Sequence, residues 1–418
     1  MTKDVLLIAA CCLAMPARAE TLRDAIAAAY DTNPQLAAAR ARQEALAEAP
    51  AQARAAGRPT AEVDGSGGYS RFDYGTGGGG VTANLPIWTG GRVPAAVRAA
   101  SGDVAAGAAG LRDIEAAVVE AVVGAYADLL YAQQAVAVAR ADIELLDHQV
   151  AEGRARFDLG KATRTDVAQL EAQRQSAVAT LADAEGAAAA VEATYRAIVG
   201  EAAGALDAAP AAPAGLPPTI ETARAWALEA NPLVRQQRLA TAADAARIDQ
   251  QRAEGHPSMS LGGTYGYAGG AGRSGYANAA IAGATLRVPL LTGGLVASRV
   301  RQAEATWRAD RFAVTGAERD ATRAAETAWA NLAAALTRAQ ANGRRVEAAD
   351  LALKGVRAEY AVSLRTTLDI LIADESLRAA QLALARSRSD VLIAQAGLLR
   401  AAGHLDRDSY APTSARPG

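Results

Sequence analysis

Alternation between apolar and small or polar residues predicts four β-strands in this sequence. In the clearest run Met259, Leu261 and Tyr265 alternate with serine, glycine and threonine, which places the apolar side chains on one face. The four runs are residues 61–74, 81–87, 258–267 and 280–288. Their length and two-faced pattern are typical of transmembrane β-barrel strands. Four such strands are too few to close a barrel within one chain.

Long segments without proline predict long helices. In the later part of the segment between Pro94 and Asp158, successive apolar residues are three and four positions apart in turn. This is the heptad pattern of coiled-coil packing. Gly160 can end this helix, and Thr163 with Asp166 forms an S/T-x-x-D start signal for the next one. The helical segments are residues 34–57, 94–158, 165–200, 232–255, 297–361 and 366–402. The helix after Pro94 would span roughly 95 to 100 Å, which is too long to fold inside a globule.

The predicted elements occur twice along the chain, with an offset of 203 residues (289 minus 86). The matching residues are Pro86 and Pro289, Gly90 and Gly293, Gly91 and Gly294, Phe157 and Tyr360, Thr163 and Thr366, and Asp166 and Asp369. We expect residues 20–200 and 219–403 to be two repeats, each with a helix, two strands, a long helix and a return helix. Residues 201–218 form a linker rich in proline and alanine, and the polar tail 404–418 is predicted to be disordered.

An open four-stranded sheet cannot stand alone in lipid, because the unpaired N–H and C=O groups at its edges each cost several kcal/mol. Strands from several chains must therefore close a common barrel. Eight strands from two chains would be filled by side chains, whereas twelve strands from three chains leave a channel. The sequence thus predicts an α+β membrane protein, in which a shared β-barrel continues as a helical duct.

The N-terminus predicts export from the cytoplasm. Lys3, the apolar stretch from Val5 to Ala14 and a small-residue site ending at Ala19 are typical of a signal peptide, residues 1–19, that is cut before Glu20. A lipoprotein site at Cys11 is the alternative. Both cysteines lie in this leader, so no disulfide is expected.

Composition narrows the function classes. The chain is 51% apolar but only 4% aromatic, which favours long, closely packed alanine-rich helices. No window offers the 18 or more apolar residues of a membrane-spanning helix. The net charge of -2, without basic clusters, argues against a nucleic-acid partner.

Candidate chemistry is sparse, and we expect no enzyme, no cofactor and no metal. His148, His256 and His404 are scattered without metal-ligand spacing, and the glycine run 77–80 leads into a strand instead of opening a helix. A structural periplasmic coiled-coil protein without transport activity is the alternative from another class. The four strand segments argue against it, because such a protein has no use for them.

The opening Leu22-Arg23-Asp24-Ala25 through Asn33-Pro34, the strand-to-helix corners and the helix turns resemble the TolC-like outer-membrane factors, especially those of type I secretion. The resemblance covers essentially the whole mature chain. It implies a homotrimer in the outer membrane, with a 12-stranded β-barrel of four strands per chain and an α-helical periplasmic tunnel. It also implies a periplasmic membrane-fusion adaptor and an inner-membrane transporter, ABC or proton-driven, as partners. The cargo would be protein in type I secretion or, second, drugs and other small molecules.

The same resemblance implies sites at the helix turns. A gate latch would join Thr165 and Asp166 to Tyr360 and Arg365, and Asp369 would form an aperture ring of three carboxylates. The second aperture carboxylate of the family is replaced here by Ile372. The nearby Asp374 lies five residues after Asp369 and about 140° from it around the helix, so it cannot simply substitute. Adaptor docking is expected at Leu159, Gly160, Lys161, Val362, Ser363 and Leu364. Helix capping by Asp166 and Asp369, and an ordinary solvated Arg365, remain open as alternatives.

Overall fold

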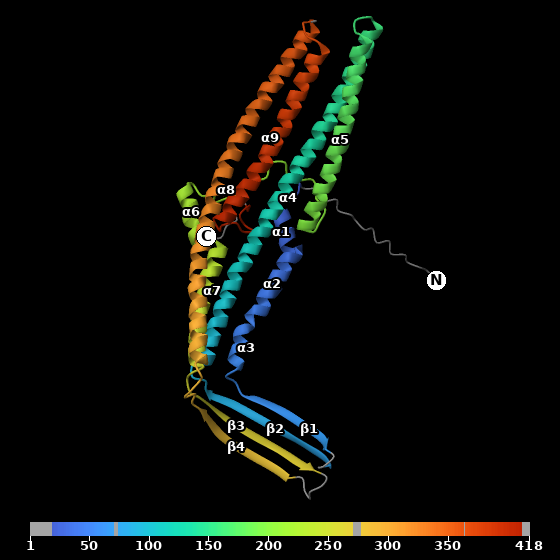
Figure 1. The fold of residues 1–418 in the computed structure, drawn as a ribbon. Coiled ribbons are helices and arrows are strands. Elements are labelled where there is room, and N and C mark those ends of the chain that lie inside the picture. The colour runs from blue at the N-terminus through green and yellow to red at the C-terminus, as the bar shows by residue number, and fades with distance from the viewer. Residues whose placement is uncertain (1–18, 71–73, 271–276, 363, 412–418) are drawn as a thin grey trace, which may run out of the picture. The chain divides into compact units, whose positions relative to one another are not determined.

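The computed structural model describes residues 19–70, 74–270, 277–362 and 364–411. In chain order its elements are α1 (Leu22–Thr32), α2 (Pro34–Ala47), α3 (Ala49–Ala55), β1 (Thr60–Ser70), β2 (Tyr74–Trp88), α4 (Arg92–Asp158), α5 (Arg164–Val199), α6 (Ile220–Ala230), α7 (Pro232–Ala253), β3 (Ser258–Gly270), β4 (Ala277–Arg287), α8 (Leu295–Ala361) and α9 (Thr367–Ala401) (Figure 1). The order of short helices, two strands, long helix and return helix occurs twice. The strands and long helices lie within a few residues of the predicted ranges, apart from β2, which begins seven residues earlier.

The described residues fall into two compact units. The sheet unit comprises Ala37–Ile114 and Ala227–Arg323, and therefore holds all four strands. The helical unit combines the described parts of Met1–Leu36, Glu115–Trp226 and Ala324–Gly418. Both units take segments from each half of the sequence, so the two repeats share each unit.

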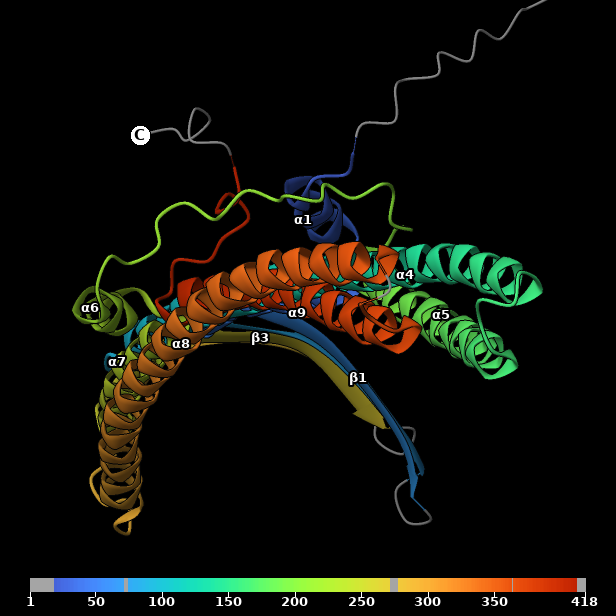
Figure 2. The ribbon, with the colours of Figure 1, turned by 90° about the horizontal axis from the view of Figure 1, so that it is seen from above.

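The sheet unit is built on one antiparallel sheet with the strand order β1-β2-β3-β4. The central pair, β2 and β3, joins the first repeat to the second, with Val81 opposite Tyr265 and Leu85 opposite Leu261. The register shifts between Pro86 and Trp88, where a proline that cannot donate to the ladder coincides with an irregularity. Figure 2 shows that β1 and β3 bend in the same sense, so the sheet is curved.

The two faces of this sheet differ in chemistry. Residues directly opposite each other across a strand pair share a face, and the face shifts with every residue along the strand. One face carries Val63, Val81, Leu85, Leu261, Tyr265, Tyr267 and Leu286, all of them exposed. The opposite face carries Glu62, Asp64, Thr82, Asn84, Thr264 and Thr285, with Ile281 as an apolar exception. The predicted two-faced pattern is confirmed.

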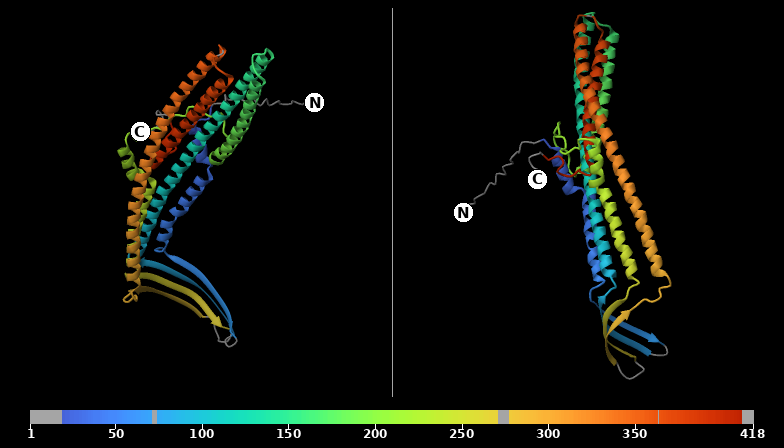
Figure 3. Two further views of the ribbon diagram at one scale, coloured as in Figure 1. Left: turned by 45° about the horizontal axis from the view of Figure 1, so that its top comes forward. Right: turned by 90° about the vertical axis from the view of Figure 1, so that its left-hand side faces the viewer.

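The helical unit contains two antiparallel hairpins, one formed by the end of α4 with α5 and one by the end of α8 with α9 (Figure 3). Both α4 and α8 are 67 residues long, which corresponds to roughly 100 Å of helix. A small apolar core made by Leu146 and Val150 of α4, Leu170 and Ala177 of α5, and Leu371 of α9 holds the hairpins together. Small side chains elsewhere allow close approach of the helices.

Within the helical unit, partly buried hydrogen bonds hold the segment that opens at Glu20 against α4 and α5. Tyr126 of α4 is fully buried, and its hydroxyl donates to the backbone carbonyl of Glu20 (2.9 Å) or of Asp207 (3.1 Å). Tyr195 of α5 donates to the Glu20 carboxylate at 2.5 Å. At the end of α1, the amide of Asn33 donates to the Ile198 carbonyl (3.1 Å), so the Asn-Pro motif anchors α1 to α5.

The prediction of a disordered tail is wrong for residues 404–411. Leu405 and Tyr410 are buried, and the amide of Ala214 in the linker donates to the Ser409 carbonyl at 3.0 Å. Burying these apolar side chains offsets the entropy cost of ordering the segment. Residues 412–418, and the predicted signal peptide apart from Ala19, lie outside the described residues.

Candidate functional site: the paired helix turns

The first helix turn joins α4 to α5. Gly160 adopts the left-handed conformation (φ 70°), and its amide donates to the Phe157 carbonyl at 2.8 Å. The amide of Lys161 reaches back to the Arg156 carbonyl at 2.8 Å, which completes a Schellman-type end to α4. Glycine is needed at position 160 because other residues pay about 1 kcal/mol or more for this conformation.

Both return helices begin with a capping box. Thr163 accepts a hydrogen bond from the amide of Asp166, whose carboxylate in turn accepts one from the Thr163 amide at 2.8 Å. Thr366 and Asp369 repeat this arrangement at the start of α9. These hydrogen bonds lower the pKa of both aspartates below the ordinary carboxyl value, because they favour the charged form. The capping role of the two aspartates is confirmed.

The predicted latch residues are placed as follows. The described hydrogen bonds of Asp166 go to Thr163 and not to Tyr360 or Arg365. Arg365 donates to Glu359 at 2.7 Å and lies 4.0 Å from Asp369. Thr165 is exposed at the start of α5. The four residues are thus brought to the two turns, and within the described contacts of one chain they do not bond to each other.

A contact that sequence reasoning missed links the two hairpins instead. The guanidinium of Arg156 lies 4.6 Å from the centre of the Tyr360 ring, within the range of a cation–π interaction. The Tyr360 hydroxyl lies 3.4 Å from that of Thr367. Arg156 belongs to the first repeat and Tyr360 to the second. No local pattern could have paired them, since they are 204 positions apart (360 minus 156).

The turns expose apolar side chains. Leu159 is 71% exposed, Val362 66% and Leu364 75%, while Gly160 and Lys161 are also exposed. Ser363 lies outside the described residues. Large apolar side chains exposed at the ends of two adjacent hairpins can bury surface against another protein.

Asp369, the predicted aperture residue, is partly exposed (35% of its side chain), and one of its carboxylate oxygens caps α9. Ile372 is 57% exposed, whereas Asp374 is buried at 4%. The helix therefore turns Asp374 away from the exposed face.

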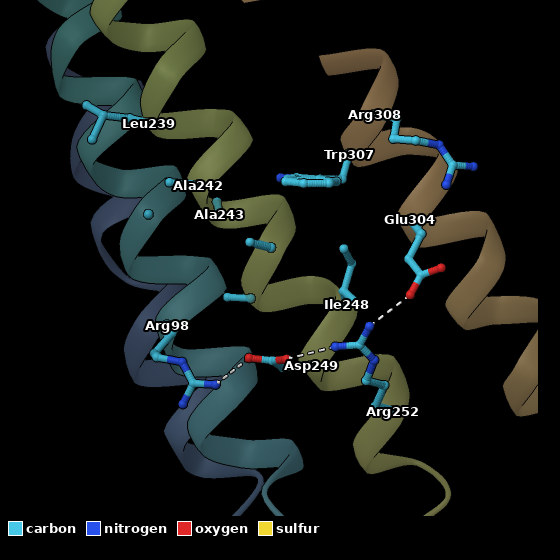
Figure 4. Close-up of a pocket in the computed structure, with 13 residues that line it drawn as sticks. Arg98, Leu239, Ala242, Ala243, Ile248, Asp249, Arg252, Glu304, Trp307 and Arg308 are labelled. Carbon is cyan, nitrogen blue, oxygen red and sulfur yellow. Dashed lines mark hydrogen bonds and ion pairs between the residues drawn. The ribbon is translucent and has the colours of Figure 1, made fainter. Parts of the chain in front are cut away.

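A groove of about 650 Å³ lies in the sheet unit between α4, α7 and α8 (Figure 4). Trp307 of α8 faces the alanine-rich surface of α7 across it. Two ion pairs lie at one end of the groove, between Arg98 and Asp249 (3.1 Å) and between Arg252 and Glu304 (2.8 Å). Its lining residues, all within the described part of the chain, include no nucleophile placed beside a base.

Among the described residues, none of the helices combines the length and the apolar run needed to cross a lipid bilayer. This fold, with a curved two-faced sheet in one unit and capped helical hairpins in the other, is also found in solved outer-membrane channels. The crystal structure of the outer membrane protein VceC from Vibrio cholerae matches 91% of this chain and 96% of its own, with a TM-score of 0.74 at 22% identity.

The chain belongs to the outer membrane efflux protein family, whose model matches residues 25–201 and 225–404. The outer membrane efflux protein BepC of Brucella suis is 34% identical over 400 residues, which cover 94% of this chain and 87% of BepC. The alkaline protease secretion protein AprF of Pseudomonas aeruginosa is 28% identical over 301 residues, 68% of this chain and 61% of AprF. The expected resemblance is confirmed, and the chain is a transport protein of the outer membrane.

Proposed function

We propose that three copies of this chain form an exit duct through the outer membrane, with a 12-stranded barrel and a helical periplasmic tunnel. The observation that carries the proposal is the four-stranded sheet, whose outer strands β1 and β4 each pair on one side only among the described residues. In lipid such edges would leave backbone groups unsatisfied. Neighbouring copies that add β1 to β4 would satisfy them and close the sheet.

The chemistry of the two sheet faces supports this arrangement. The face that carries Val63, Val81, Leu261 and Tyr265 is exposed and apolar, as a lipid-facing surface must be. The opposite face, with its threonines, Asn84 and acidic residues, suits a water-filled interior. The sheet is also curved, and closure into a barrel requires curvature (Figure 2).

The partners are a periplasmic adaptor and an inner-membrane transporter, ABC or proton-driven. The adaptor would dock on the exposed turn residues Leu159, Gly160, Lys161, Val362, Ser363 and Leu364. Three of them, Leu159, Val362 and Leu364, are large apolar side chains that remain exposed in the single chain, which is the support for this surface.

The gate would be a latch between neighbouring copies. In each copy the capping box of α5 uses Oδ2 of Asp166, which leaves Oδ1 able to accept a second donor. Arg365 or Tyr360 of the next copy can supply this second donor. The exposed Thr165, beside Asp166, would take part in the same contact. Three Asp369 side chains around the axis would form an aperture that attracts cations.

Type I protein secretion is the first candidate for the cargo, because the opening motif favours that branch and AprF is named for protease secretion. Export of small molecules is the second candidate. The specific observation in its favour is that BepC, with 34% identity over 400 residues, is named an efflux protein.

The duct is tested on the mature protein extracted from outer membranes in mild detergent. We expect a trimer by light scattering and discrete conductance steps in planar lipid bilayers. A monomer that ignores lipid would contradict the proposal and favour a structural periplasmic role. Deletion of the gene then distinguishes the two candidate cargoes. Loss of a secreted protein supports type I secretion, and increased drug sensitivity alone supports efflux.

A further inference from the structure

Helices α4 and α9 of the helical unit meet along a seam, and three ion pairs between described residues cross it. Glu120 pairs with Arg400 at 2.5 Å and Asp128 pairs with Arg386 at 2.7 Å. The third pair, Asp142 with Arg378, lies nearest to the turns. Because α4 belongs to one hairpin and α9 to the other, these pairs hold the two hairpins together.

The third pair differs from the others in burial. Only 5% of the Asp142 side chain and 19% of the Arg378 side chain are exposed, against 41% for Asp128 and 47% for Arg386. Arg378 also lies 3.1 Å from the carboxylate of Asp374, one turn earlier on α9 and itself only 6% exposed. One buried guanidinium therefore serves two buried carboxylates.

The first repeat lacks this arrangement. The residues 203 positions before Arg357 and Asp374 are Arg154 and Glu171, and they form an exposed pair at 2.6 Å between α4 and α5. In the second repeat Arg357 and Asp374 are 3.7 Å apart, and the carboxylate is turned inwards to Arg378. At the position equivalent to Arg378 the first repeat has Gln175. The buried cluster is thus an addition to the repeated fold and not a consequence of it.

The cluster is left incompletely satisfied. Among the described residues, Oδ1 of Asp142 and Nη2 of Arg378 are buried without a hydrogen-bond partner. Nε of Arg378 and Oδ2 of Asp374 lie 3.1 Å apart as an ion pair, in a geometry that does not make a hydrogen bond. Buried charges that are imperfectly paired carry a large desolvation penalty. Burial accordingly raises the pKa of the Asp142 and Asp374 carboxyls above the ordinary value, although Arg378 opposes the shift.

Few other charges face the cluster. From α4 it receives Asp142, from α9 Asp374 and Arg378, and from α8 Arg357, whose side chain is 45% exposed. The adjoining core receives only the apolar Leu170 and Ala177 from α5. With both carboxylates charged, two buried negative charges face one buried positive charge.

We propose that Asp142, Arg378 and Asp374 form a clasp between the hairpins that is strengthened when it takes up one proton from solvent. The proton adds to one carboxylate and neutralises it, so that the guanidinium balances the single remaining carboxylate. A carboxyl group whose pKa is raised in the folded state stabilises that state below the ordinary carboxyl pKa, and this contribution is lost as pH rises through the raised pKa. The hairpins are therefore held most firmly under acidic conditions and separate more readily as pH rises.

The clasp itself is a property of one chain. Its role in regulating a gate rests on the proposed duct function, because separation of the hairpins would release the turns. The test must therefore read the seam directly and not through conductance.

The contact between the hairpins is measured by amide hydrogen exchange of the full-length protein, followed by mass spectrometry from pH 4, near the ordinary carboxyl pKa, up to pH 8. After correction for the intrinsic rate, we expect protection of residues 138–150 and 370–382 to fall by about three- to tenfold across this range, within the roughly tenfold per pH unit that one proton allows. Asp374→Asn should remove this dependence and keep protection high at pH 8. Asp142→Asn provides a second, independent variant.

Asp128→Asn, on the exposed pair of the same seam, is the matched control and should keep the wild-type pH dependence. Wild-type protection that does not change with pH would overturn the proposal. So would an unchanged dependence in both Asp374→Asn and Asp142→Asn. A protein that shows the expected dependence but neither trimerises nor conducts would refute the duct and leave the clasp standing.

Discussion

Arg156 lies with its guanidinium 4.6 Å from the centre of the Tyr360 ring and so connects the end of α4 to the end of α8. The contact joins the two repeats beside their helix turns, where the proposed latch requires the hairpins to stay together. A cation over an aromatic ring at a partly exposed site contributes about 0.5 to 1 kcal/mol. That is enough to shift an equilibrium between a closed and an open tip by roughly two- to fivefold.

Arg156→Ala should therefore increase the open population of reconstituted trimers by that factor, because Tyr360 loses its partner on α4. Single-channel recording in planar bilayers would measure it as more frequent or larger conductance steps. Arg154→Ala, which removes an exposed ion pair between α4 and α5, is the control and should leave the conductance unchanged. Equal behaviour of the two variants would show that the Arg156–Tyr360 contact has no part in the gate.

The capping boxes predict a local effect on the return helices. Thr163→Ala should destabilise the first turn of α5 by about 1 kcal/mol, because the amide of Asp166 loses its acceptor. Amide exchange in residues 164–168 should accelerate roughly fivefold, while Thr180→Ala in the middle of α5 should have little effect there. If both variants exchange alike, the box does not stabilise this helix start.

The same boxes set a pH dependence that is opposite in sign to that of the buried clasp. The pKa values of Asp166 and Asp369 are lowered in the folded state, so their contribution is present above the ordinary carboxyl pKa of about 4. It is lost as pH falls through the lowered values. The turns should thus fray only in strong acid. There the first-turn amides of α5 and α9 would lose protection from hydrogen exchange. Asp166→Asn should weaken this response for α5. Constant protection down to pH 2 would contradict the assignment.

Features that depend on neighbouring residues in the chain could be predicted from the sequence. A period of two located the strands, and Thr163-x-x-Asp166 and Thr366-x-x-Asp369 located the helix starts, because their hydrogen bonds span only three residues. The glycine turn at position 160 follows the same rule. These elements carry their own local geometry.

Features that depend on tertiary packing could not be predicted in this way. Asp142 and Arg378 are 236 positions apart (378 minus 142), and each resembles an ordinary charged residue on a helix. The polar composition of the tail concealed that Leu405 and Tyr410 would find an apolar surface to cover. The partner that each of these side chains meets is fixed only when the helices pack.

Two equivalent glycines of the strand-to-helix corners should respond differently to substitution. Gly90 and Gly293 both have positive φ, 63° and 60°. A Cβ at Gly90 would lie 2.7 Å from the Pro257 carbonyl oxygen and 2.8 Å from Cβ of His256, whereas one at Gly293 meets nothing within 4 Å.

Gly90→Ala must therefore displace backbone as well as adopt a strained conformation, and Gly293→Ala suffers only the strain of about 1 kcal/mol. We expect clearly lower thermal stability and yield of membrane-inserted protein for Gly90→Ala than for Gly293→Ala. Equal losses in both variants would mean that the clash at Gly90 is relieved without cost.

Tyr126 should be more important for stability than its position in the middle of α4 suggests. Its ring is fully buried, and its hydroxyl is the side-chain donor within reach of the Glu20 and Asp207 carbonyls. Burial raises its pKa beyond the ordinary tyrosine value, so the donor is retained at any pH the protein meets. Tyr126→Phe keeps the ring but removes the hydroxyl donor from the Asp207 carbonyl, whereas the Glu20 carbonyl still accepts from the Asp207 amide at 3.0 Å. The free energy of unfolding should fall by about 1 to 3 kcal/mol. Tyr131→Phe is the control, because the described contact of Tyr131 is between its ring and Arg386. Denaturant unfolding of the full-length protein would measure both, and equal stability of the two variants would show that the Tyr126 hydroxyl does not stabilise the segment at Glu20.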